Sequence, residues 1–345
     1  MWNTRLRMRL SFEHPGNAPS LCGTLRVFHV EHYCDRLRCP APPFRQPAKC
    51  STWNICTVCT LRAATPATYH AREASTTFQK APMGRIIAIA NQKGGVGKTT
   101  TAINLAASFA AAEVNTLLVD CDAQSNATSG VGFARDADRI STYHVIMGEA
   151  TAEEALQRTA LDQLWLIPAH KNLVGANIEL VEADRREFRL RDALALVRER
   201  FQYIVLDCPP ALDFLTVNAL VAADAVLIPM QAEYFALEGI TELLDTIERI
   251  RAGLNEHLAI EGVVLTMFDE RTNLAQQVVN ELKNFFGDKL CETAVPRNIR
   301  LAEAPSHGKP ALLYDVKSKG AESYIRLAKE IMGRSNTSTN VNVID

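Results

Sequence analysis

The chain has 345 residues, 47% of them apolar, which is enough for a sizeable core in one large or two ordinary domains. Its formal net charge of −2 conceals an acidic part, residues 83–345, which argues against a strongly basic nucleic-acid-binding module but leaves room for a local basic patch. No uninterrupted apolar stretch reaches the roughly twenty residues that a membrane span needs, so we expect a soluble protein.

The charge is unevenly distributed along the chain. Residues 1–82 hold eleven of the 37 Lys and Arg residues, four of the 39 Asp and Glu residues and six of the nine cysteines, a net charge of +7. The remainder holds 26 basic and 35 acidic residues, a net charge of −9. We therefore interpret the two parts separately.

Residues 1–82 are broken by prolines and have no sustained helical or strand period, so we predict no fold for them. Cys56 and Cys59 form one Cys-x-x-Cys pair, which would suit a zinc site, but a second tight pair is missing. An Arg-rich, acid-poor segment would also suit an organellar transit peptide.

A strand, a glycine loop and a helix are predicted next, from the apolar run 86–90, the loop 91–101 and the helically spaced residues 102–110. Glycines let backbone N–H groups converge on phosphate oxygens, and the helix N-terminus adds the positive end of its dipole. Lys98 can reach the β- and γ-phosphates, and the Thr99 hydroxyl can ligate Mg²⁺. The predicted cofactors are therefore ATP and Mg²⁺. The predicted cofactor-binding residues of this loop are Lys93, Gly94, Gly95, Val96, Gly97, Lys98, Thr99 and Thr100.

One departure from the usual P-loop is informative. Gln92 stands where the first glycine is expected, and Lys93 follows it. The segment Lys-Gly-Gly-Val-Gly-Lys-Thr at 93–99 resembles the deviant Walker A loop of the ParA/MinD ATPases. The resemblance implies a nucleotide-sandwich homodimer in which Lys93 reaches the phosphates of the other subunit. Lys93 and Lys98 are accordingly predicted to be catalytic.

Two carboxylates end the next predicted strand, Thr116–Asp122. Asp120 and Asp122 alternate along the strand, so we expect them to share one face and to lie near the phosphates. The segment resembles the family's Asp-x-Asp-Pro-Gln-Gly-Asn, with Ala123 in place of the proline and Ser125 in place of the glycine. By this resemblance Asp122 positions the hydrolytic water, and Asp120 is a Mg²⁺ ligand or a structural residue.

A further acidic residue ends a Walker B-like strand at 203–207, where Asp207 would hold a Mg²⁺-bound water. Before it we predict a helical stretch at 152–157, a strand at 164–167 and an amphipathic surface helix at 182–200.

Strands and helices alternate to the end of the chain, with strands predicted at 225–229 and 261–267 and helices at 238–254, 276–286 and 320–332. This alternation predicts an α/β fold of the P-loop NTPase, deviant Walker A class, with a doubly wound, mostly parallel sheet flanked by helices. Cys121, Cys208 and Cys291 are interpreted as small buried residues. We expect one ATPase domain at 83–333 and a disordered tail at 334–345.

The segment Pro296–Ser306 resembles the Pro-Arg-Asn-x-Arg-Leu-x-Glu-Ala-Pro-Ser segment of chromosomal ParA proteins of the Soj type. The resemblance places Pro296 and Asn298 near the adenine and gives Arg271 and Arg300 the role of binding DNA phosphates. Arginines neutralise phosphates without reading sequence. Each arginine could equally be a surface salt-bridge partner.

Taken together, the resemblance implies a partitioning ATPase that is cytoplasmic and nucleoid-associated, with weak intrinsic ATP hydrolysis. The ATP-bound homodimer would bind nonspecific double-stranded DNA, and hydrolysis stimulated by a ParB-like protein bound at parS would release it. Three alternatives stay open. A MinD-like membrane-cycling division regulator needs a C-terminal amphipathic basic helix, a sequence-specific repressor needs a helix-turn-helix before the P-loop, and a metabolic enzyme needs an additional substrate pocket. Chromosome and plasmid cargo are not distinguished.

A parS-like sequence also offers a third interpretation of residues 1–82. Residues 27–32 can be encoded by GTG TTC CAC GTG GAA CAY, and residues 50–55 by TGT TCC ACG TGG AAC ATH. Both contain the palindrome TGTTCCACGTGGAACA, in two reading frames, and it resembles parS. We therefore expect 1–82 to be translated upstream DNA and Met83 to be the true start.

Overall fold

The computed structural model describes residues 84–233 and 238–341, and the statements below concern these residues alone. The interpretations of residues 1–82, including the Cys56–Cys59 zinc site, lie outside them.

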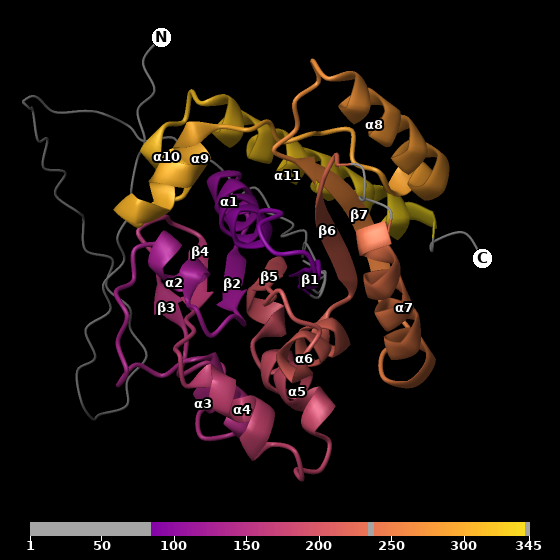
Figure 1. The fold of residues 1–345 in the computed structure, drawn as a ribbon. Helices are drawn as coiled ribbons and strands as arrows, with labels where there is room; N and C mark the ends of the chain where they lie inside the picture. The colour runs from indigo at the N-terminus through magenta and orange to yellow at the C-terminus, as the bar shows by residue number, and fades with distance from the viewer. Residues whose placement is uncertain (1–83, 234–237, 342–345) are drawn as a thin grey trace, which may run out of the picture. The chain divides into compact units, whose positions relative to one another are not determined.

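A seven-stranded sheet forms the centre of the described chain, in the order β3-β4-β2-β5-β1-β6-β7 (Figure 1). Only β3 and β4 pair antiparallel; every other pair is parallel. The strands are β1 Arg85–Ile89, β2 Thr116–Asp120, β3 Gln157–Arg158, β4 Leu164–Ile167, β5 Tyr203–Asp207, β6 Ala225–Gln231 and β7 Ala259–Thr266. Every residue of β2 and β5 is buried, as continuous apolar runs in a parallel sheet require.

Helices cover both faces of the sheet. The α-helices are α1 Lys98–Ala111, α2 Asn126–Gly130, α3 Thr142–Met147, α4 Leu173–Glu179, α5 Arg189–Ala195, α6 Phe214–Ala222, α7 Glu238–Gly253, α8 Asn273–Phe286, α9 Ile299–Glu303, α10 Ala311–Tyr314 and α11 Lys319–Val341. Short 3₁₀ helices are η1 Arg186–Phe188, η2 Arg198–Arg200, η3 Gly287–Lys289 and η4 Ala304–His307. In Figure 1, α1 and α9–α11 lie on one side of the sheet and α3–α6 on the other.

Alternate residues of the strands point to opposite faces of the sheet and pack into two separate hydrophobic cores. Ile87 and Ile89 of β1 pack with α1 and α11, whereas Ile86 and Ala88 pack with the helices between α3 and α8. The predicted doubly wound α/β fold is thus confirmed. Cys121, Cys208 and Cys291 are buried free thiols, and burial raises the pKa of each.

Two helix predictions were wrong. Residues 152–155 form turns, and Gln157 already belongs to β3, with Ala152 and Ala155 in the core. The single helix expected at 182–200 is divided into η1, α5 and η2. Of its apolar positions, Leu190, Leu194 and Val197 are buried, whereas Phe188 is half-buried and Leu196 is 73% exposed. Arg185 has a left-handed φ of 52°, which interrupts the predicted helix before η1.

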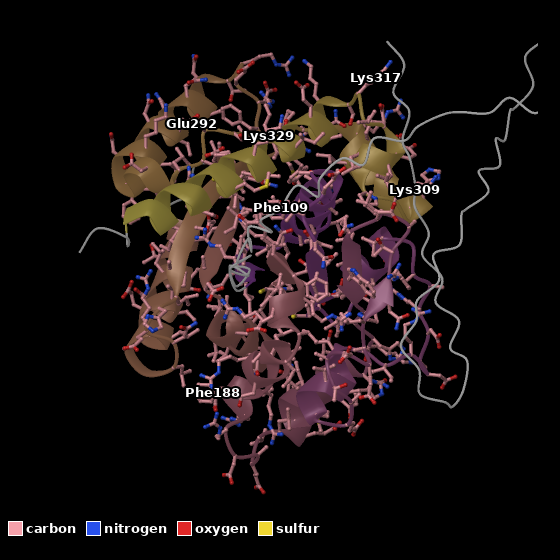
Figure 2. All side chains as sticks on the ribbon, turned by 180° about the vertical axis from the view of Figure 1, so that it is seen from behind. Phe109, Phe188, Glu292, Lys309, Lys317 and Lys329 are labelled. Carbon is pink, nitrogen blue, oxygen red and sulfur yellow. The ribbon has the colours of Figure 1, made fainter. Side chains whose placement is uncertain are left out.

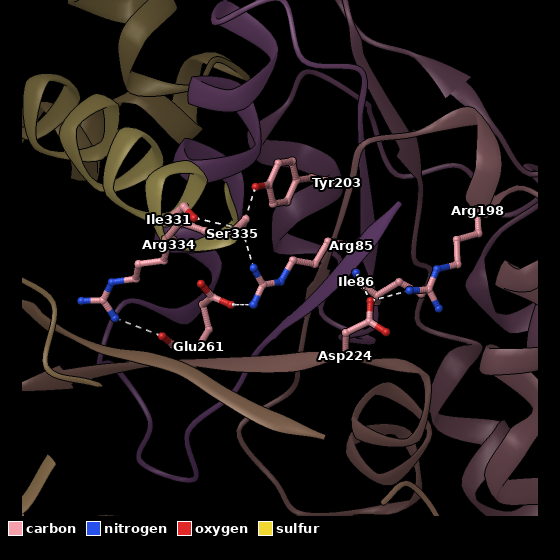
Figure 3. Close-up of polar contacts among 9 residues, drawn as sticks. All are labelled: Arg85, Ile86, Arg198, Tyr203, Asp224, Glu261, Ile331, Arg334 and Ser335. Carbon is pink, nitrogen blue, oxygen red and sulfur yellow. Dashed lines mark hydrogen bonds and ion pairs between the residues drawn. The ribbon is translucent and has the colours of Figure 1, made fainter. Parts of the chain in front are cut away.

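The tail prediction was also wrong as far as Val341, because α11 continues past Gly333. Tertiary contacts account for the extension (Figure 3). Arg334 donates to the Glu261 carbonyl and pairs with Glu330, and the Ser335 hydroxyl contacts Tyr203 at 3.1 Å and also the Arg85 guanidinium.

The edge of the sheet formed by the amino ends of the strands holds the start of β1. Arg198 donates to the Gly84 carbonyl at 2.7 Å and pairs with Asp224, whose carboxylate accepts the N–H of Ile86 (Figure 3). A Cβ on Gly84 would lie 2.3 Å from the Phe201 carbonyl oxygen, so only glycine fits there. No helix in the described part of the chain is long and apolar enough to cross a membrane.

Candidate nucleotide and metal site

The three central strands bring the predicted site residues to one edge. β5 lies between β2 and β1, and its Asp207 is in register with Asp120 of β2 and with Ile89 of β1. The P-loop leaves β1 directly beyond Ile89. The structure therefore brings the glycine loop, Asp120 and Asp207 together, as the strand-end rule predicted.

Residues that follow β1 give the loop its shape. Gly95 and Gly97 have φ values of +75° and +85°, which glycine adopts without strain. Gly97 precedes the first turn of α1, whose N–H groups have no partners within the helix. A Cβ on Gly94 or Gly95 would meet no atom within 4 Å, so the space beside these glycines is open to a ligand. This is the geometry of a phosphate cradle.

Neighbouring strands hold the loop through its carbonyl groups. The Gln231 side chain at the end of β6 donates to the Gly95 carbonyl at 3.0 Å. The Thr266 hydroxyl at the end of β7 donates to the Val96 carbonyl at 2.7 Å. Sequence reasoning missed both residues, although each is a polar residue that ends a buried strand, the signal that identified Asp207.

Lys98 begins α1 and is 7% exposed. Its ammonium donates to the Lys93 carbonyl at 3.0 Å. Burial lowers its pKa, and Asp207, Cys208 and Asp122 oppose the shift. A desolvated ammonium at the mouth of a phosphate cradle is suited to bind a phosphate oxygen. The ammonium of Lys93 forms an ion pair with Glu233, beyond the end of β6.

Asp207 is the strongest candidate for a metal site. It is completely buried, and burial, followed by the neighbouring Asp120, raises its pKa well above the usual range. Neither carboxylate oxygen makes a hydrogen bond of ordinary geometry within the described residues, although the Thr99 hydroxyl and the Lys98 ammonium are near enough to oppose that rise. A buried carboxylate without partners is costly unless a cation compensates it. Asp207 and Thr99 together therefore fit Mg²⁺, with oxygen ligands of the kind it prefers.

Asp120, by contrast, has partners within the protein. One carboxylate oxygen accepts the N–H and the hydroxyl of Thr128 at 2.8 and 2.7 Å, and the other accepts the N–H of Asp122 at 3.1 Å. Burial nevertheless raises its pKa to about 6. These contacts favour the structural role for Asp120 over the metal-ligand role, and Thr128 is a third residue that sequence reasoning missed.

Asp122 lies beyond the end of β2, in the following turn, so the expectation that it shares a strand face with Asp120 was wrong. The Asp122 carboxylate closes this turn by accepting the N–H of Gln124 at 2.9 Å. Asp122 is half-buried and near enough to Lys98 and Asp207 to influence the pKa of both. Ser125, which replaces a family glycine, has a left-handed φ of 57°.

The residues predicted to lie near the adenine and to bind DNA all follow β7 in the chain. Pro296 forms an isolated parallel β-bridge with Phe268, which lies just beyond β7. The Asn298 side chain caps α9 by accepting the N–H of Arg300 at 2.9 Å. Arg271 pairs with Asp269 at 2.6 Å, and Arg300 pairs with Glu303 at 2.8 Å and with Asp315 at 3.3 Å.

Both arginines are therefore surface salt-bridge partners in this structure, with side chains 85% and 46% exposed. Exposed ion pairs of this kind stabilise a protein little and exchange readily with other partners. A cavity of about 1250 Å³ between β7, α8 and α11 is lined by none of the residues predicted for the site.

Comparison with known proteins gives consistent results. A family model described as an AAA domain matches residues 84–260. The chain is 55% identical over 254 residues to the chromosome partitioning protein ParA of Myxococcus xanthus, covering 74% of this chain and 90% of that one. It is 52% identical over 249 residues to the sporulation initiation inhibitor protein Soj of Bacillus subtilis, covering 72% of this chain and 98% of that one.

Solved structures share the fold. Cobyrinic acid a,c-diamide synthase from Mycobacterium smegmatis, with bound ADP and magnesium, has a TM-score of 0.65 and 32% identity, covering 74% of this chain and 97% of that one. The cell division ATPase MinD from Pyrococcus furiosus has a TM-score of 0.60 and 26% identity, covering 73% of this chain and 99% of that one.

Proposed function

The chain belongs to the ParA/Soj family of chromosome partitioning proteins, and from this we propose that it is an ATP-driven switch for DNA partitioning. Its cofactors are ATP and Mg²⁺. The observation that carries the proposal is the register of Asp120 and Asp207 beside the glycine loop, with the buried oxygens of Asp207 lacking ordinary hydrogen bonds. Such a site has the residues to bind a nucleotide and its metal ion.

The residues of the proposed site bind three groups: the phosphates, the metal ion and the attacking water. The N–H groups of the loop 93–99 and the start of α1 bind the phosphates, and Lys98 neutralises them. Thr99 and Asp207 hold Mg²⁺, which neutralises charge on the phosphates when it is bound. Asp122, half-buried at the rim, accepts a hydrogen bond from the attacking water and orients it.

The proposed homodimer is based on the position of Lys93. Its side chain is 46% exposed at the mouth of the site, and we propose that it contacts the phosphates of a second subunit. Each active site is then complete only in the ATP-bound homodimer. Hydrolysis is slow in the absence of a partner and is stimulated by a ParB-like protein bound at parS.

DNA binding is proposed for the surface of the C-terminal segment. Arg300 lies on α9, and the exposed residues Lys309, Lys317 and Lys329 come from the same segment, α9–α11 (Figure 2). Arg271 would add to this surface. A dimer doubles the number of phosphate contacts, so affinity and its salt dependence rise steeply on ATP binding. The protein is thereby placed on nucleoid DNA without sequence preference.

A MinD-like role is less well supported. It requires a C-terminal amphipathic basic helix whose apolar face is free to bind a membrane, whereas Leu327, Ala328 and Ile331 of α11 are buried in the core.

The test is nonspecific DNA binding by the full chain with ATP, with ADP and without nucleotide. We expect ATP-dependent binding that Arg300→Glu abolishes. Arg191→Glu is the matched control, because Arg191 is also an exposed arginine paired with a carboxylate, but on α5. Equal binding with all nucleotides, or equal loss in both variants, would contradict the proposal.

A further inference from the structure

Three contacts join the C-terminal end of β6 to the P-loop. The Asn91 side chain donates to the Pro229 carbonyl at 2.7 Å, and Gln231 donates to the Gly95 carbonyl at 3.0 Å. The third contact is the ion pair between Lys93 and Glu233. The first two hold backbone atoms, whereas the third holds the side chain that distinguishes this loop from an ordinary P-loop.

The ion pair is a contact within one subunit. The N–H of Lys93 is fixed by the Asn91 side chain at 2.9 Å, and its carbonyl accepts the Lys98 ammonium at 3.0 Å. With its backbone held at both groups, Lys93 can redirect its ammonium only by rotating its side chain. In this structure the ammonium lies on Glu233.

We infer that Glu233 is a positioning residue for Lys93, which holds the ammonium within its own subunit until the phosphates of a second subunit displace the carboxylate. The inference rests on the proposed ATP-dependent dimer. One ammonium cannot lie at Glu233 and also over phosphates across an interface, so each subunit must break its pair when the dimer forms. Glu233 therefore sets the ATP and protein concentrations at which dimerisation begins.

The size of the effect follows from exposure. The Lys93 and Glu233 side chains are 46% and 51% exposed. Exposed ion pairs of this kind correspond to a factor of roughly two to five in an equilibrium constant. Because a dimer breaks two pairs, removing them should lower the dimer dissociation constant roughly 4- to 25-fold. Salt screens such pairs, so the advantage should shrink as ionic strength rises.

The experiment is sedimentation velocity of the full chain across a range of protein concentrations, with a slowly hydrolysed ATP analogue and Mg²⁺. It compares wild type, Glu233→Gln and the control Glu113→Gln, an exposed glutamate just beyond the far end of α1. We expect Glu233→Gln to dimerise at lower concentration than the other two, and the difference to close at about 1 M salt, where charges are screened within a few ångströms.

The outcomes separate the two proposals. If wild type and control dimerise and Glu233→Gln behaves identically, or its advantage does not depend on salt, the positioning role is wrong and the proposed dimer stands. If no protein dimerises at any concentration, both the dimer and the role of Glu233 fail. A variant that dimerises less readily than wild type would show that Glu233 supports the interface, which also overturns the inference.

Discussion

The hydroxyl of Thr101 lies 3.0 Å from the hydroxyl of Tyr324, and both side chains are completely or almost completely buried. Thr101 belongs to the first turn of α1 beside the P-loop, and Tyr324 belongs to α11. Nearby, the Asn104 side chain accepts the N–H of Ala311 at 2.7 Å. Buried hydrogen bonds thus tie the phosphate-binding helix to the segment that carries the proposed DNA surface.

Tyr324→Phe should destabilise the protein by about 1–2 kcal/mol, because it leaves the Thr101 hydroxyl buried without this partner. Denaturant titration measures the loss. Tyr143→Phe removes an exposed hydroxyl bound to Glu179 and should change stability by less than about 0.5 kcal/mol. Equal effects of the two changes would show that the Thr101 contact contributes nothing specific.

Ser125→Gly should stabilise the protein by about 0.5–1 kcal/mol, since glycine adopts the left-handed φ of 57° without the steric cost that serine bears. Ser108→Gly is the opposite control, because Ser108 lies inside α1, where glycine is unfavourable, and its hydroxyl donates to the Asn104 carbonyl. Thermal unfolding compares the three proteins. A fall in stability with glycine at 125 would mean that the serine side chain outweighs the backbone strain.

Asp207→Asn should lower ATP hydrolysis about 10- to 100-fold, the usual effect of removing a group that orients a metal-bound water. The same change should raise the stability of the protein without Mg²⁺, because a buried carboxylate without ordinary hydrogen bonds is removed. Asp245→Asn, on an exposed position of α7, should change neither property. Activity retained in Asp207→Asn would exclude the proposed metal role.

The stability of the metal-free protein should fall as the pH rises from about 4 through 6. The pKa of Asp120 is raised from 3.8 to about 6, so its contribution is fully present below pH 3.8 and is lost as the pH passes the folded-state pKa. Over this window the loss is about 3 kcal/mol for one group. Denaturant titrations of wild type and Asp120→Asn in a chelator should diverge accordingly, and parallel pH profiles would contradict the shift.

The origin of residues 1–82 is tested by the codons of the gene. If the segment is translated upstream DNA, the codons for residues 27–32 and 50–55 will each contain TGTTCCACGTGGAACA. Expression from Met83 should then give a protein with the same ATPase activity as the full chain. Other codons at either place would end this explanation.

Continuous apolar runs that end in carboxylates predicted the centre of the fold correctly. β2 and β5 have this pattern, and the rule that strand ends meet at one edge was enough to place Asp120 and Asp207 together. The partners of these carboxylates could not be predicted, because Thr128 reaches Asp120 from another element. From the sequence Asp120 could be a Mg²⁺ ligand or a structural residue, and its contacts with Thr128 and Asp122 were needed to favour the structural role.

Tertiary contacts explain most of the errors in the secondary structure predicted from the sequence. The helix α6 was missed because Phe214–Ala222 is mostly apolar on all sides and carries no helical period. The polar tail was interpreted as disordered because the contacts of Arg334 and Ser335 involve residues far away in sequence, Glu261 and Tyr203.

The hydrogen bond between Arg85 and Ser335 also brings the first strand and the last helix to the same place. That place is the amino-end edge of the sheet, one strand length of about 16 Å from the P-loop. A fluorophore or surface tether attached at this edge of the sheet should therefore leave the nucleotide face free for single-molecule measurements.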